Sequence, residues 1–309
     1  MENERESFIG KNAKIATVVA VVFGAASGIL GSLIEAPSMA IGFWRLTIAL
    51  PFFGVPIFAN GEEREKLKAI SKKDLIWCFI GGFFLFAHFF SWFSAVKLTN
   101  VASASVLAAL HPLVVLLITV FIYRRKVSWK SVVAILIALA GGAVIAFGGA
   151  GSIFDGGTID IGTSKGNAFA FMAGVFMGLY FAVGGSVRKR VSGRLYVFLV
   201  FSACWICFII GTLATGTAVL GYRTEDYVLI AAMAMICQIG SHAVFNMCIG
   251  HVSSLYVSTW EAGEPVFSII LGIIFLSQIP SEFEIIGAVV VVLALLYYNR
   301  QENSREDEL

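Results

Sequence analysis

Ten hydrophobic runs dominate this sequence, and each is long enough to cross a lipid bilayer as a helix. A helix rises about 1.5 Å per residue, so about 20 apolar residues span the hydrocarbon core. The runs lie at about 13–33, 38–59, 74–96, 101–122, 128–149, 166–186, 195–217, 226–249, 253–276 and 282–299. Hydrophobic residues make up 58% of the chain and charged residues 14%, which excludes a soluble globular domain. The sequence therefore predicts an all-α integral membrane protein.

Basic residues gather in the loops on one side of the predicted spans. If the N-terminus is cytoplasmic, the cytoplasmic segments are both termini and the basic loops at 60–73, 123–130 and 187–194. The opposite loops hold only Lys97, Lys165 and Arg223. Because short cytoplasmic loops are enriched in Lys and Arg, both termini are predicted to lie in the cytoplasm, with the protein in the cytoplasmic (inner) membrane. The modest net charge of +2 gives no sign of nucleic-acid binding.

The two halves of the chain resemble each other. A shift of 153 positions brings four residues into register without a gap: Ser105, Ala109, Pro112 and Ser128 fall on Ser258, Ala262, Pro265 and Ser281. Each half contains five predicted spans, an odd number, so the halves should have opposite orientations in the membrane. We therefore expect ten transmembrane helices as two inverted five-helix repeats, residues 1–150 and 151–309. The pairs Gly24/Gly28 and Gly174/Gly178 are interpreted as ordinary close-packing positions.

Two acidic residues, Glu261 and Glu264, lie near the middle of the ninth run, just before Pro265. Their spacing places both on one face of a helix. Carboxyl groups at this depth are costly, so they normally face a partner or a water-filled cavity. A substrate or ion site is one interpretation, and a structural pair that bonds neighbouring helices is the other. Pro112 and Pro265 are predicted to bend their helices and to act as hinges.

His111 precedes Pro112 just as Glu264 precedes Pro265, so the repeat places these two side chains opposite each other. Two bent helices that meet at the centre are expected to form a cavity lined by His111, Glu261 and Glu264. Low dielectric disfavours a charged carboxyl, so one Glu can hold a proton near neutral pH and exchange it for a cationic substrate. His111 can assist, or it can be a core histidine bonded to a backbone carbonyl.

Further polar and aromatic residues are candidates for the same path. Arg45 can pair with Glu35, pair with a midplane Glu, or bind a substrate carboxylate. Four aromatic residues could line the path and hold an organic cation or an aromatic ring: Trp92, Tyr180, Tyr256 and Trp260. Trp92 can instead anchor the helix at the membrane interface, and Trp260 can simply pack.

Four segments, in this order along the chain, resemble the EamA-type members of the drug/metabolite transporter superfamily: Phe43-Trp44-Arg45, Ser91–Leu117, Lys165–Phe181 and Ser253–Leu276. The resemblance covers nearly the whole chain. It implies ten spans in two inverted repeats and a secondary transporter without a cofactor, acting as a monomer or homodimer. The expected activity is alternating-access movement of a small organic metabolite (an amino acid, an amine or a drug-like compound), as export coupled to a proton or another counter-ion.

A membrane-embedded enzyme or metal-site protein is the competing hypothesis. It would use His88, His111, His242 and the pair Glu261/Glu264. The chain has neither HExxH nor GxSxG, and its histidines lie in different spans. The sequence therefore predicts no enzyme, no metal and no cofactor.

Overall fold

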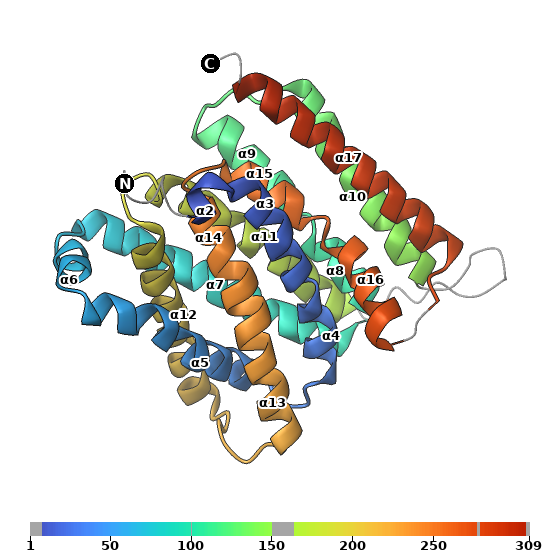
Figure 1. Ribbon diagram of the computed structural model, residues 1–309. Coiled ribbons are helices and arrows are strands. Elements are labelled where there is room, and N and C mark those ends of the chain that lie inside the picture. The colour runs from blue at the N-terminus through green and yellow to red at the C-terminus, as the bar shows by residue number, and fades with distance from the viewer. Residues whose placement is uncertain (1–7, 100, 150–163, 277–278, 307–309) are drawn as a thin grey trace.

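The computed structural model describes residues 8–99, 101–149, 164–276 and 279–306, which form helices and no strand (Figure 1). The first half contains α2 (Phe8–Lys11), α3 (Ala13–Gly24), α4 (Ala26–Leu33), α5 (Ser38–Ala59), α6 (Gly61–Lys68), α7 (Lys72–Leu98), α8 (Val101–Ala108), α9 (His111–Leu117), the π-helix η1 (Ile118–Ile122) and α10 (Trp129–Gly149). The second half contains α11 (Ser164–Val187), α12 (Gly193–Thr215), α13 (Thr224–Met233), the π-helix η3 (Ala234–Ala243), α14 (Val244–Cys248), α15 (Ser254–Glu261), α16 (Glu264–Leu276) and α17 (Glu282–Glu306). The predicted boundary between the halves, at residue 150, lies outside the described residues.

Eight of these helical segments are long and apolar enough to cross a membrane. They coincide with eight of the ten predicted runs. The fifth run gives a shorter apolar helix, Trp129–Ile145, and the ninth is divided between α15 and α16. The protein is thus a multi-pass membrane protein, and the count of ten spans stays a prediction.

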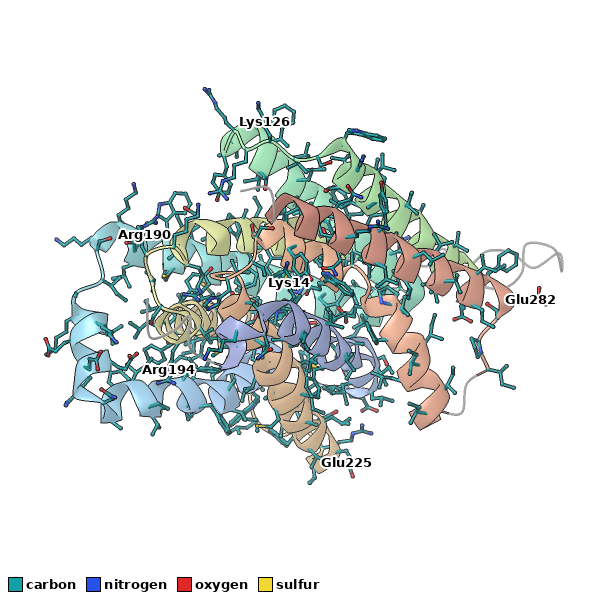
Figure 2. The ribbon with its side chains drawn as sticks, turned by 45° about the horizontal axis from the view of Figure 1, so that its top comes forward. Lys14, Lys126, Arg190, Arg194, Glu225 and Glu282 are labelled. Carbon is teal, nitrogen blue, oxygen red and sulfur yellow. The ribbon has the colours of Figure 1, made fainter. Side chains whose placement is uncertain are left out.

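The outward-facing surface of the helices is apolar, as a lipid-facing surface requires. Phe121, Leu213 and Ile274 are examples of large hydrophobic side chains that remain exposed. Charged side chains gather instead at the helix ends. Figure 2 shows Arg190 and Arg194 toward the end of the molecule that carries α6, and Glu225 and Glu282 away from it.

The helices form two groups. In the first, α7 packs along α11, and α8 and α9 also contact α11. In the second, α3 packs on η3 and α14, and α15 and α16 also contact α3. α5 and α12 pack on each other beside these groups, while α10 and α17 lie side by side at the periphery (Figure 1).

The helices that contain Pro112 and Pro265 break at corresponding positions, whereas α5 continues through Pro51 and Pro56. α8 ends at Ala108 and α9 begins at His111, while α15 ends at Glu261 and α16 begins at Glu264. The same shift of 153 positions relates the two breaks. In each pair the second segment has proline in its first turn, where the missing N–H has no intrahelical partner to lose. The prolines therefore start a new segment instead of bending a continuous helix.

Candidate functional site

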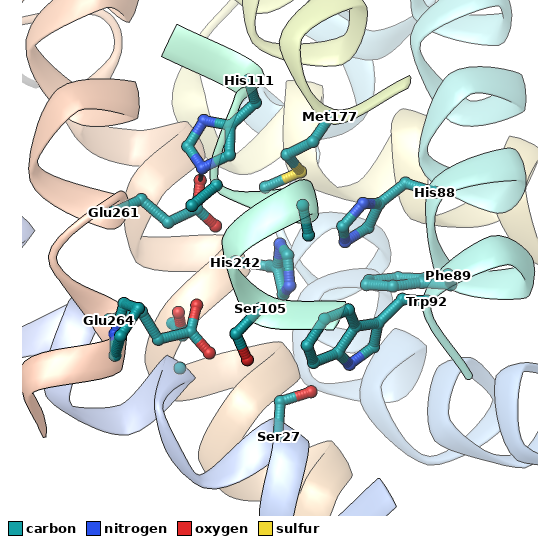
Figure 3. Close-up of a pocket in the computed structure, with 15 residues that line it drawn as sticks. Ser27, His88, Phe89, Trp92, Ser105, His111, Met177, His242, Glu261 and Glu264 are labelled. Carbon is teal, nitrogen blue, oxygen red and sulfur yellow. Dashed lines mark ion pairs between the residues drawn. The ribbon is translucent and has the colours of Figure 1, made fainter. Parts of the chain in front are cut away.

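A cavity lies between the two helix groups (Figure 3). Its lining comes from both groups and from both helix breaks: Gly24, Ser27, His88, Phe89, Trp92, Ser105, Ala108, Ala109, His111, Met177, Ser241, His242, Glu261, Glu264 and Pro265. A mostly apolar cavity with a few converging polar groups is the usual form of a small-molecule site.

The break between α15 and α16 brings both acidic side chains to this cavity. Glu261 is the last residue of α15 and is 7% exposed. Glu264 is the first residue of α16 and is less buried, with its carboxyl group beside Ser105 in the view of Figure 3. The structure thus places His111, Glu261 and Glu264 around one cavity, the arrangement that the repeat predicts.

His111 lies between a carboxyl group and a hydroxyl group. Its Nε2 atom is 3.5 Å from Glu261 Oε2, and its Nδ1 atom is 3.3 Å from Ser258 Oγ. These contacts join α9 to α15 across the boundary between the helix groups. His111 is therefore not the core histidine bonded to a backbone carbonyl that was the alternative; the pair of contacts can pass a proton between Glu261 and the imidazole ring.

Glycine residues on α11 allow the α8–α9 break to approach closely. A Cβ atom at Gly174 would lie 2.7 Å from the Ala108 carbonyl oxygen. At Gly178 it would lie 2.5 Å from Val114 Cβ and 2.9 Å from the His111 carbonyl oxygen. On α3, a Cβ at Gly24 would lie 2.9 Å from Ser241 Oγ. These positions determine how near the helices stand where they form the cavity wall.

Of the other predicted site residues, Trp92 lines the cavity and Arg45 lies behind its wall. Arg45 is completely buried, with its guanidinium carbon 4.3 Å from the centre of the Phe89 ring and 5.9 Å from that of Phe93. The suggested pair with Glu35 does not form, because Glu35 binds Arg223 at 3.0 Å.

Tyr180, Tyr256 and Trp260 do not line the cavity. Tyr180 is fully buried and accepts a hydrogen bond from Asn246 Nδ2. Tyr256 donates to Asn299 Oδ1 at 2.9 Å and so ties α15 to α17. Trp260 packs beside the small apolar cluster that α10 and α17 form with Val266. These three side chains join helices.

Phe89 and His242 were not predicted as residues of the cavity lining. Both residues line the cavity, with the Phe89 ring edge-on to the His242 ring at 4.9 Å between centres. The signal was the spacing of His88, Phe89 and Trp92, which fall on one face of a single helix. His88 itself bonds the Ala173 carbonyl oxygen at 2.9 Å. Among the residues searched, no group of three His, Cys, Asp or Glu side chains could hold a metal ion.

Contacts around Arg188 join the end of α11 to α14, at the end of the helices that the basic loops predict to be cytoplasmic. Arg188 Nε donates to the Asn246 carbonyl oxygen at 2.9 Å, and Nη2 donates to that of Met247 at 3.3 Å. The nearby bond between Tyr180 and Asn246 also joins α11 to α14. We call this set of contacts the Arg188 closure.

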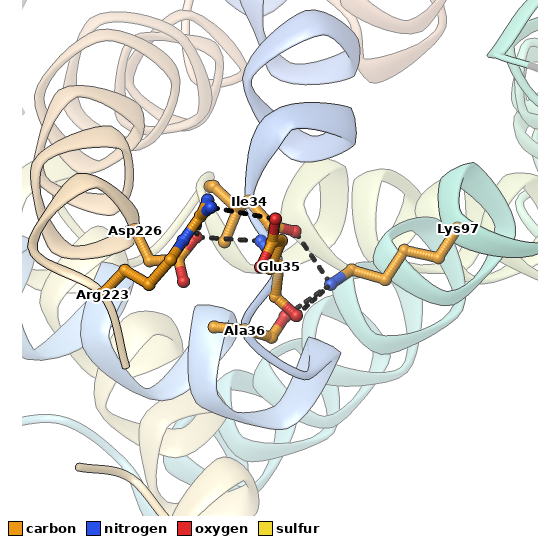
Figure 4. Close-up of polar contacts among 6 residues, drawn as sticks. All are labelled: Ile34, Glu35, Ala36, Lys97, Arg223 and Asp226. Atoms are coloured by element: carbon orange, nitrogen blue, oxygen red, sulfur yellow. Dashed lines mark hydrogen bonds and ion pairs between the residues drawn. The ribbon is translucent and has the colours of Figure 1, made fainter. Parts of the chain in front are cut away.

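Contacts around Lys97, at the end of α7, join that helix to the segment after α4 (Figure 4). Lys97 Nζ donates to the carbonyl oxygens of Ile34, Glu35 and Ala36, at 3.0, 3.4 and 2.5 Å. Asp226 on α13 accepts the Glu35 backbone N–H at 2.9 Å. We call this set the Lys97 closure.

Similarity to known proteins agrees with this geometry. The sequence model of the EamA-like transporter family matches residues 12–147 and again 164–300. The uncharacterized transporter YxxF of Bacillus subtilis (strain 168) is 25% identical over 292 residues, which cover 94% of this chain and 90% of that protein. A solved crystal structure shares the fold with a TM-score of 0.75 at 18% identity, over 96% of this chain and 99% of the other. Since the family match extends over most of the sequence, the chain belongs to the EamA-like transporter family, within the drug/metabolite transporter superfamily, and is a membrane transporter.

Proposed function

We propose that this protein is a secondary active transporter that exports a small organic amine or zwitterion in exchange for protons. The observation that carries the proposal is the pair Glu261 and Glu264, held with His111 at two corresponding helix breaks around one cavity. An acidic group in a water-poor environment strongly favours either a proton or a cationic partner. It can therefore hold one or the other, but not both.

The proposed exchange of substrate for a proton takes place at the Glu264 carboxyl group. A substrate ammonium group enters the cavity and displaces the proton from Glu264, which then carries the charge that pairs with the ammonium. When the substrate leaves on the other side, a proton returns to the carboxylate. His111 lies between Glu261 and Ser258. It can accept the proton from Glu261 when the Glu261 carboxylate also pairs with the substrate ammonium group.

Alternating access would follow from the division into two helix groups. The cavity lies between them, and the contacts around Lys97 and Arg188, which join different helices, would close its two ends. Opening one closure while the other holds would expose the cavity to one side at a time. Pro112 and Pro265 would be the hinges, because each lies at a break where no continuous helix resists rotation.

The membrane orientation belongs to the same proposal. We place the protein in the cytoplasmic membrane as ten spans in two inverted repeats, with both termini in the cytoplasm. The α2 helix and the last turns of α17 lie toward the same side of the molecule, as this topology requires (Figure 1). The basic loops then face the cytoplasm, and the Lys97 closure faces outward.

The test is proton flux in proteoliposomes that contain a trapped pH indicator. A panel of amines and amino acids is added outside, and a true substrate should change the internal pH through the parent protein. Glu264→Gln should abolish the response, because a neutral amide cannot release a proton. Glu225→Gln is the matched control, since Glu225 is exposed at the start of α13 and distant from the cavity lining. A Glu264→Gln variant that still couples substrate to protons would refute the proposed site.

A further inference from the structure

Arg45 is a buried charge without a counter-ion. Its side chain is the largest that is fully buried, and none of its three guanidinium nitrogens has a hydrogen-bond partner among the described residues. Its guanidinium group makes cation–π contacts with the rings of Phe89 and Phe93. A cation–π contact offsets only part of what a cation loses when it leaves water, so this guanidinium is prepared to bind an anion.

The Arg45 charge lies next to the substrate cavity, with one aromatic ring as the partition. Phe89 contacts the guanidinium and also lines the cavity. The charge is near enough to act electrostatically on Glu264, His88 and His242, three other residues of the lining. A change in the Phe89 side-chain torsion would join Arg45 to the cavity.

A second, independent observation points to the same place. The η3 segment, which packs against α5, is a ten-residue π-helix. Three of its buried side chains have polar atoms without hydrogen-bond partners in the described structure: Gln238, Ser241 and His242. Two of these, Ser241 and His242, line the cavity. Interruptions of this kind occur frequently at functional sites, and unpaired buried polar atoms call for a ligand.

We propose that Arg45 binds the carboxylate of a zwitterionic substrate whose ammonium group is held by Glu264. The inference rests on the proposed transport function and deepens it by naming the substrate class, a small amino acid. On binding, the Phe89 ring turns aside and the carboxylate reaches the guanidinium, where Ser241 can donate a further hydrogen bond. Ligands with only one of the two charges satisfy only half of this site.

Matched ligands separate the two halves of the site. The purified protein in nanodiscs is screened against the twenty common L-amino acids by thermal stability. The best of them is then compared by calorimetry with its decarboxylated amine and its deaminated acid. Arg45→Gln should weaken binding of the amino acid about tenfold or more and leave the amine within about twofold, whereas Glu264→Gln should weaken both. Arg45→Lys should recover part of the lost affinity, because it restores the charge but not the planar donor pair.

Each outcome bears on one claim. Equal binding of the amino acid to the parent and to Arg45→Gln overturns the inference while the proton exchange at Glu264 stands. The same holds if amines bind and no amino acid does. An unchanged affinity in Glu264→Gln overturns the proposed site instead.

A second variant covers the case that Arg45→Gln does not fold. Phe89→Leu keeps the arginine and removes the aromatic partition. It should tighten binding of the deaminated acid, which in the parent must displace the ring before it reaches the guanidinium. Phe90→Leu, at the neighbouring aromatic residue of α7 that is neither on the lining nor in these cation–π contacts, is the control and should not tighten it. No difference between the two variants overturns the role of Arg45.

Discussion

The Lys97 closure and the Arg188 closure form the same kind of hydrogen bond, but from different side chains and with different burial. In each, a cationic side chain donates to backbone carbonyl groups of a different helical span: Lys97 of α7 to Ile34, Glu35 and Ala36 after α4, and Arg188 after α11 to Asn246 and Met247 of α14. Such carbonyls at a helix C-terminus carry partial negative charge and have no intrahelical donor. Under the proposed repeat, the first and third spans correspond to the sixth and eighth, so equivalent helix pairs are joined at opposite ends.

The difference between the closures is burial. Arg188 is 4% exposed and is joined by the fully buried Tyr180, whereas Lys97 is exposed and its neighbouring ion pair between Arg223 and Glu35 is exposed as well. Hydrogen bonds that water can replace contribute little, while buried donors and acceptors left without partners are expensive. We therefore expect the Lys97 closure to open more readily than the Arg188 closure.

The largest effect is expected from Arg188→Met. It leaves the carbonyl groups of Asn246 and Met247 buried without a donor, and we expect a loss of about 3 kcal/mol in unfolding free energy. The measurement is thermal or denaturant unfolding of the purified protein. Lys189→Met is the control, because Lys189 is the next residue and is exposed. Equal effects of the two substitutions would show that the Arg188 contacts do not hold this end together.

Tyr180→Phe tests the second contact of the same closure. The substitution removes the hydroxyl that accepts from Asn246 Nδ2, although that nitrogen keeps its bond to the His242 carbonyl oxygen at 2.7 Å. We expect a loss of about 2 kcal/mol, since one buried donor is left unpaired. Tyr222→Phe, at a partly exposed tyrosine outside both closures, should cost less. The reverse order would contradict the importance that we assign to burial.

Lys97→Met should cost only about 1 kcal/mol, because water can reach the carbonyl groups that it releases. Its main effect should be on access. Ser27, on the cavity lining, is replaced by cysteine. This cysteine should react faster with an impermeant maleimide added outside when the protein also carries Lys97→Met than when it keeps Lys97. Lys165→Met removes another exposed lysine of the predicted outer side and should leave the rate unchanged. A rate that Lys97→Met does not raise would mean that the Lys97 closure is no gate.

The smallest effect is expected from Glu35→Gln. It breaks the 3.0 Å ion pair with Arg223, but both side chains are exposed and solvent screens their attraction. The change in unfolding free energy should not exceed about 0.5 kcal/mol and should vanish at high salt. Asp226→Asn, at a buried carboxyl that accepts the Glu35 N–H, is the contrasting variant and should cost more.

The positions of the two helix breaks are features that a local sequence pattern can predict. The register of Pro112 with Pro265 predicted a matched irregularity in two spans, and both helices break there, with His111 and Glu264 as the first residues of the new segments. Proline removes a backbone donor within its own turn, so the sequence marks where a helix can break. Because α5 continues through Pro51 and Pro56, packing decides whether it does. The three polar residues predicted to meet at the centre lie at these two breaks.

The contacts of the aromatic residues, in contrast, are features that a local sequence pattern does not predict. Tyr180, Tyr256 and Trp260 were expected along the path and instead join helices, while Phe89 was overlooked and separates Arg45 from the cavity. Composition does not distinguish these positions, because each residue lies in a run that is apolar on all sides. Only the rotation of each helix about its axis and the identity of its neighbour decide which face meets the cavity.

By itself the sequence determined the membrane class, eight of the ten predicted spans and the positions of the two matched irregularities at Pro112 and Pro265. These depend on hydrophobic run length and on proline, which are properties of consecutive residues. The tertiary structure alone decided that Lys97 and Arg188 bind the carbonyl groups of another span, and that Arg45 forms no ion pair with a described residue. Such contacts join residues far apart in the chain, and in lipid no amphipathic pattern marks in advance which faces will pack together.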